Sequence, residues 1–175
     1  METHYTEYGG RMWQIYRNLY DKMNPGCYVH IEFENGDVSM FHFSNGSGEG
    51  ESNWDPSEEK IDSLLTQSGL DRKSLAWLEN ELDKIGCISI SMQAAPGNPY
   101  SIGFRRVGMG KYSFRFYHHA LSPERLDSIN SCGNLIVFND SIVFEYGSGA
   151  FGSMNFPGKE EYMKKKSQIH YDTDR

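Results

Sequence analysis

The sequence lacks a long hydrophobic run, a leader-like segment and a surplus of positive charge. No apolar stretch approaches the roughly 20 residues that a membrane-spanning helix needs. Residues 1–10 are polar and carry neither the basic nor the apolar stretch of a signal peptide. These absences predict a cytoplasmic protein that has no membrane partner.

Cysteine is scarce and its spacing is irregular. Cys27, Cys87 and Cys132 form no C-x-x-C pair. An odd number of cysteines without a secretion signal argues against a disulfide framework. The sequence therefore predicts three buried thiols.

The six histidines show none of the spacings that are typical of a metal site. His30 and His42 are expected on opposite faces of one hairpin, so they would not share an ion. His118 and His119 are consecutive at a strand end and diverge in the same way. The sequence thus assigns no metal, and a site assembled from distant segments stays open.

Negative charge dominates and is unevenly distributed. The chain carries 17 Lys and Arg against 24 Asp and Glu, a net charge of -7. Residues 1–85 hold 7 basic and 16 acidic groups, whereas residues 86–175 hold 10 and 8. A nucleic-acid partner needs a basic footprint, which this balance does not supply. The acidic half favours a basic protein partner, although net charge of this sign also simply maintains solubility.

Hydrophobic periodicity predicts helices and strands that come in runs. Apolar spacing of three and four residues indicates a helix over residues 11–23, and alternation indicates a hairpin around Asn35-Gly36. A pair of helices is expected over residues 55–86. The remaining predicted elements are strands at 88–93, 100–106, 111–117, 135–138 and 142–146, and helices at 122–132 and 159–168.

This order predicts an α+β domain with a mainly antiparallel sheet, on which the N-terminal helix and the helical pair pack. A doubly wound α/β fold is the alternative. We expect one domain over residues 1–168 and a loose tail over 169–175. Segment 44–55 is predicted to be a loop. The strands at 135–138 and 142–146 are predicted to be interior, because both of their faces are apolar.

Acidic side chains concentrate between residues 49 and 62, around one tryptophan. Six carboxylates fall within this segment, and only Lys60 offsets them. An aromatic anchor within a charged rim is typical of protein-binding surfaces, and the alternative is a solvated loop and first helical turn. The residues expected to contact a partner are Glu51, Trp54, Asp55, Glu58 and Glu59.

Basic side chains gather on one face of the strands at 100–106 and 111–117. Alternation places this set on the face of the strands opposite the apolar one, and the set is predicted to bind an anion or a ligand. The residues of the set are Arg105, Lys111, Arg115 and Tyr117.

Arg105 is expected directly across from Lys111, and a like-charge pair costs stability unless an acid offsets it. Two sources of that acid stay open. One is the chain itself, through Glu32, Glu34 or the 49–62 segment, and the other is an acidic ligand or a phosphate.

Two glycine-rich segments approach phosphate-binding motifs without meeting them. Residues 147–152 match G-x-G-x-x-G but continue without helix character, and residues 103–111 displace the lysine of a phosphate loop. No nucleophile elbow and no acid/base pair of carboxylates is recognised. The sequence therefore assigns no cofactor and no catalytic residue.

The sequence favours a small intracellular protein that acts by binding, of the inhibitor or immunity type, over an enzyme. Its 49–62 segment would face a basic protein, because carboxylates steer association with a cationic cleft. The alternative is a small-molecule binder or enzyme with a cleft near Arg105, Arg115 and the 147–152 loop, in which His118 acts as acid or base. The oligomeric state does not follow from the sequence.

Overall fold

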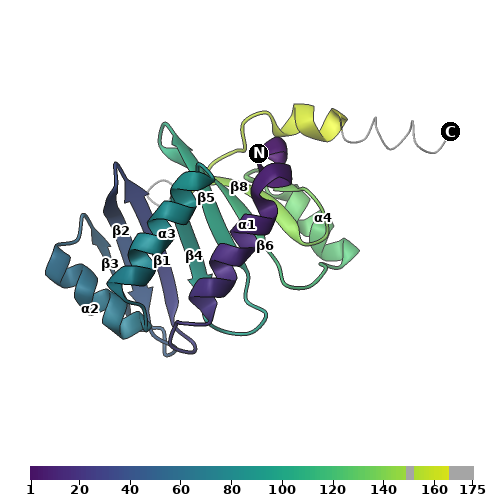
Figure 1. Cartoon of the computed structure of the whole chain (residues 1–175). Helices are drawn as coiled ribbons and strands as arrows, with labels where there is room; N and C mark the ends of the chain where they lie inside the picture. The colour runs from purple at the N-terminus through teal and green to yellow at the C-terminus, as the bar shows by residue number, and fades with distance from the viewer. Residues whose placement is uncertain (149–151, 166–175) are drawn as a thin grey trace.

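The computed structural model describes residues 1–148 and 152–165. It confirms the α+β class, with a large antiparallel sheet and an N-terminal helix (Figure 1). The helices are α1 (Glu2–Tyr20), α2 (Glu58–Ser68), α3 (Arg72–Lys84) and α4 (Pro123–Ser131), and residues 159–165 are also helical. The strands are β1 (Tyr28–Glu34), β2 (Asp37–Ser44), β3 (Gly50–Trp54), β4 (Ser89–Gln93), β5 (Tyr100–Val107), β6 (Gly110–Phe116), β7 (Leu135–Val137), β8 (Ile142–Ser148) and β9 (Gly152–Ser153).

The order of the strands maps the two halves of the chain onto the two ends of the sheet. The order is β3-β2-β1-β4-β5-β6-β8-β7, β9 pairs with β8, and every described pair is antiparallel. Strands β1 to β3, from the acidic half of the sequence, form one end, and β3 is its edge. The second half of the chain supplies the other end.

The main core lies on the face of the sheet that α1, α2 and α3 cover (Figure 1). Alternate residues of the strands, such as Val29 and Phe41, are fully buried there. Ile15 of α1, Leu64 of α2 and Leu78 of α3 are buried in the same cluster. The helical pair therefore contributes its apolar stripes to this core. Within the described residues, no helix is both long enough and apolar enough to cross a bilayer.

The opposite face of the sheet carries a second, smaller apolar cluster at its β7 and β8 end. Val143 pairs with Arg115 and Val137, so it points away from the main core, and Ile129 of α4 packs with both valines. Helix α4 thus covers this end of the second face. This explains why β7 and β8 are apolar on both faces, although only β8 is interior and β7 lies at the edge.

Three expectations about single segments are wrong. Helix α1 begins at Glu2, well before residue 11. The glycine-rich segment 44–55 contains a strand, β3, although its composition is typical of a loop. Cys132 is exposed, whereas Cys27 and Cys87 are buried free thiols as predicted. The predicted tail at 169–175 and the middle of the 147–152 loop lie outside the described residues.

Two β-bulges change which side chains share a face. The irregularity between Glu32 and Phe33 pairs His30 directly with His42, so these histidines lie on the same face and not on opposite ones. The irregularity between Gly103 and Arg105 pairs Arg106 with Lys111, while Arg105 pairs with Tyr112. A one-residue bulge reverses the faces predicted by strict alternation.

Candidate functional site

The edge strand β3 carries the most exposed large apolar side chain of the described structure. Trp54 is 64% exposed and lies across from Met40, on the face of the sheet away from the main core. No further strand pairs with the outer side of β3 within the described residues. An exposed edge offers unpaired backbone groups, and an exposed tryptophan offers an apolar anchor.

We name the surface formed by β3 and the first turn of α2 the acidic edge; it comprises Glu49, Glu51, Trp54, Asp55, Glu58, Glu59 and Asp62. Two cations offset part of its charge. Lys60 Nζ donates to Glu51 at 2.6 Å, and Arg72 bridges Glu58 at 2.7 Å and Asp62 at 2.5 Å. Six carboxylates thus face two cations.

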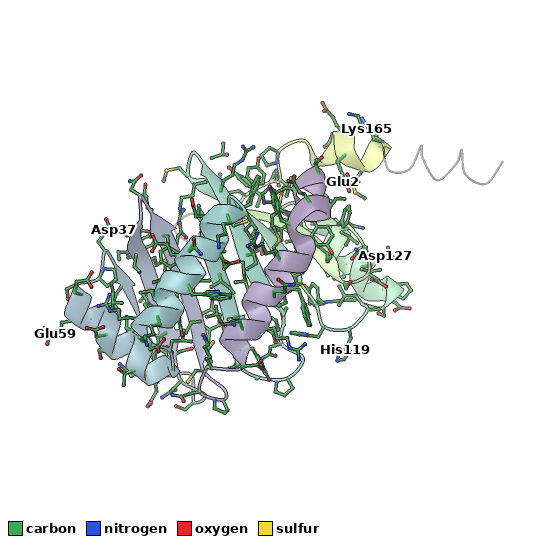
Figure 2. All side chains as sticks on the ribbon, viewed as in Figure 1. Glu2, Asp37, Glu59, His119, Asp127 and Lys165 are labelled. Carbon is green, nitrogen blue, oxygen red and sulfur yellow. The ribbon has the colours of Figure 1, made fainter. Side chains whose placement is uncertain are left out.

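Asp55 and Glu59 have no ion pair among the described residues. The N-cap of α2 is Ser57, whose hydroxyl accepts from the backbone N–H of Lys60 at 3.3 Å, so Asp55 does not cap the helix. Glu59 lies on α2 at the extreme end of the molecule (Figure 2). These two carboxylates are therefore available to an external cation.

The five residues predicted to contact a partner thus fall into two groups. Trp54 is exposed, and Asp55 and Glu59 are exposed and without an ion pair in the described part of the chain, whereas Glu51 and Glu58 are each held by a cation of the chain. Sequence adjacency brings all five to one end of the molecule, because β3 leads directly into α2. Their predicted role in binding stays a prediction.

A second polar cluster occupies the face of the sheet that lacks the main core. Its centre is Glu32 of β1, which is 3% exposed. Arg106 Nε donates to Glu32 Oε1 at 2.5 Å, and Lys111 Nζ donates to Oε2 at 2.7 Å. Lys111 also donates to the Ser89 hydroxyl at 3.2 Å. The Glu32 cluster therefore links β1, β4, β5 and β6.

His30 extends the Glu32 cluster toward the acidic end of the sheet. Its Nε2 lies 3.4 Å from Glu32 Oε2, and its Nδ1 lies 2.6 Å from the Ser91 hydroxyl. Its cross-strand neighbour His42 bonds through Nδ1 to the Ser52 hydroxyl. A neutral His30 that donates from Nε2 to Glu32 accepts the Ser91 proton at Nδ1.

Burial and charge act in opposite directions on these groups. Burial alone would raise the pKa of Glu32, but the hydrogen bond from His30 and the charge of Lys111 together hold it well below its usual range. Burial lowers the pKa of His30. The positive charge of Lys111 lowers this pKa further, whereas the hydrogen bond and the charge of Glu32 raise it. Burial also lowers the pKa of Lys111. Glu32 stays ionised and His30 stays neutral near neutral pH.

The chain's own carboxylate, Glu32, offsets the paired cations of β5 and β6, which was one of the two alternatives left open. The cation across from Lys111 is Arg106, which alternation did not identify because of the bulge. Arg115 is similarly neutralised by Glu145 at 2.7 Å. Lys111 and Arg115 are thus engaged within the chain.

The set predicted to bind an anion does not gather on one face. Arg105 lies on the core side of the sheet beside Tyr112, while Lys111 and Arg115 lie on the other side. Tyr117 packs against the small cluster under α4. His118 packs against the Tyr16 ring of α1, with ring centroids 5.1 Å apart. The expectation of a shared face is wrong for Arg105.

Comparison with known proteins gave no match to a family model, to a curated protein or to a solved structure. Among the described residues, no group of three or more His, Cys, Asp or Glu side chains is arranged to hold a metal ion. In the described part of the chain, Arg105 and two carboxylates of the acidic edge, Asp55 and Glu59, have no ion pair.

Proposed function

We propose that the protein acts by binding a basic protein at the acidic edge. One observation carries this proposal: Trp54, 64% exposed on an edge strand, directly precedes Asp55, a carboxylate that has no ion pair among the described residues. Aromatic side chains within a polar rim supply most of the binding energy in protein interfaces. The surrounding carboxylates select a partner of opposite charge and accelerate its association.

The arrangement of the whole sheet supports a basic partner. Residues 1–85 carry the excess of acidic groups, and they form the end of the sheet that β3 terminates. The negative electrostatic potential of residues 1–85 therefore reinforces that of the acidic edge. Blocking the cationic cleft of another protein, as an immunity or inhibitor protein does, is the form of binding that we propose.

The test compares two variants with the same change in charge. The edge variant carries Asp55→Asn, Glu58→Gln and Glu59→Gln, and the control variant carries Asp127→Asn, Glu160→Gln and Glu161→Gln. Asp127 lies on α4, at the other end of the molecule from Glu59 (Figure 2). Parent and variants are immobilised and exposed to lysate of the source cells at low and at moderate salt, and retained proteins are identified by mass spectrometry.

We expect a basic protein that the parent and the control variant retain at low salt and that the edge variant loses. Higher salt weakens its retention, because screening acts on exposed charges. Equal retention by the edge variant, or no basic protein retained by the parent, contradicts the proposal. The fold of each variant is verified by its thermal unfolding.

A further inference from the structure

Beyond protein binding, we propose that a hollow beside Arg105 binds a small aryl carboxylate. The hollow has a volume of about 400 Å³ and lies between the first residues of α1, strands β5, β6 and β8, and residues 156–162. Figure 1 shows the start of α1 next to the C-terminal helical segment, at the end of the molecule away from α2. The hollow is thus separate from the acidic edge.

Aromatic rings form its walls. Phe104, Tyr112, Phe156 and Tyr162 are half-buried, and Phe144 is buried beneath them. The rings of Tyr112 and Phe156 meet edge to face, with centroids 5.4 Å apart. Rings held in this way accept a further aromatic ring by edge-to-face or offset contact. The volume falls within the range of small-molecule sites, at about 300–1,000 Å³.

Arg105 supplies the positive charge. Its guanidinium lies over the Phe104 ring, 5.1 Å from the ring centroid. The other three cations of the β5–β6 hairpin each bind a carboxylate, but Arg105 has no ion pair in the described part of the chain. A planar guanidinium that is not engaged by the protein is suited to a bidentate contact with a ligand carboxylate.

The β-bulge explains why Arg105 differs from its neighbours. Because the register shifts between Gly103 and Arg105, Arg106 takes the position across from Lys111 and binds Glu32. Arg105 is consequently directed to the core side, where it lines the hollow with Phe104. The bulge thus separates the arginine that binds Glu32 from the arginine that has no ion pair within residues 1–148 and 152–165.

Two hydroxyls can assist Arg105. Burial raises the pKa of Tyr112 and Tyr162, so both phenols stay protonated at neutral pH and can donate hydrogen bonds. Glu2 also lines the hollow, and its charge adds to the rise at Tyr162. A ligand with one carboxylate and an aromatic ring matches this combination of donors and ring walls.

The test uses phenylacetate as the charged probe and phenylacetamide as its neutral analogue. Binding to the full chain is followed by chemical-shift changes of the aromatic side chains and by thermal stabilisation. Arg105→Gln removes the proposed carboxylate contact. Arg125→Gln on α4 is the matched control, because Arg125 does not line the hollow.

We expect saturable binding of phenylacetate, with shifts at Tyr112 and Phe156. Arg105→Gln and the neutral amide should each weaken binding about tenfold or more, as for loss of a charge-assisted hydrogen bond. Arg125→Gln should bind like the parent. Absence of saturable binding, or equal affinity in Arg105→Gln or for the amide, overturns the proposal. Unliganded Arg105→Gln should unfold near the parent's temperature, since the residue is exposed and has no ion pair among the described residues.

Discussion

Glu32 is a carboxylate that is almost completely removed from water and is balanced entirely by neighbouring side chains. Lys111, at 17% exposure, depends on it in turn. Burying two charges costs more than their attraction returns unless further hydrogen bonds satisfy them, and here Arg106, Ser89 and His30 provide those bonds. Removing one partner leaves the others desolvated and unpaired.

Glu32→Gln is therefore expected to lower the free energy of unfolding by about 3–5 kcal/mol. Glu145→Gln is the control, because Glu145 also binds a cation of β6 but is 24% exposed and loses less. Urea unfolding of the parent and both variants measures the difference. A loss in Glu32→Gln no larger than in Glu145→Gln would contradict the importance assigned to burial.

His30 should make stability depend on pH. Its folded-state pKa is lowered by burial, so below about pH 6.5 the unfolded chain binds a proton that the folded chain does not. The free energy of unfolding therefore falls as the pH falls through this range. The low pKa of Glu32 adds a loss only below its unfolded value of about 4.5, which separates the two effects.

In His30→Gln, the free energy of unfolding should fall less between neutral pH and about pH 5.5 than in the parent. His4, whose pKa burial also lowers, remains in the variant and leaves a residual slope. Urea unfolding across this range is the measurement. Identical slopes in parent and variant would show that His30 does not couple protonation to folding.

At the level of elements, Gly103 permits the close approach of β4, β5 and β6. A Cβ at this position would lie 2.1 Å from Ser89 Oγ and 3.2 Å from Lys111 Cδ. Gly103→Ala should therefore destabilise the protein by about 1–3 kcal/mol, as overpacking does. Gly147→Ala on β8 should have a smaller effect, since no atom of the described residues other than its chain neighbours lies within 4 Å of its added Cβ. Equal unfolding free energies for the two variants would contradict this steric argument.

The same bulge limits what the sequence can predict. Alternation correctly identified most strands and the face of residues such as Ile102 and Phe114, because the core selects period-two patterns. It misplaced Arg105 and missed Arg106, since nothing in residue type marks where the register shifts. The detectable signal was the predicted like-charge pair, which required a nearby acid; Glu32 was one candidate, together with Glu34, the 49–62 segment and an external anion.

Strand β3 could not be predicted for a different reason. Its residues are mostly polar or glycine, so neither β-propensity nor apolar alternation distinguishes it from a loop. Hydrogen bonding to β2 holds this segment as a strand. The acidic composition of the segment was visible in the sequence, but its position at a sheet edge followed only from the fold.

At the scale of the molecule, the uneven distribution of charge along the sequence produces an uneven distribution of charge between the two ends of the sheet. The acidic first half of the chain supplies the strands that lead to β3, whereas three cations of β5 and β6 in the second half are offset by Glu32 and Glu145. The acidic edge and the hollow beside Arg105 lie toward opposite ends of the sheet. Binding at one need not obstruct the other.

The most direct test of the central claim is the dissociation constant of the retained basic protein, measured for parent, edge variant and control variant at low and moderate salt. We expect the edge variant to bind about tenfold more weakly at low salt and to depend less on salt, because it has three fewer exposed negative charges. The control variant should match the parent. An edge variant with the parent's affinity and salt dependence would contradict binding at the acidic edge.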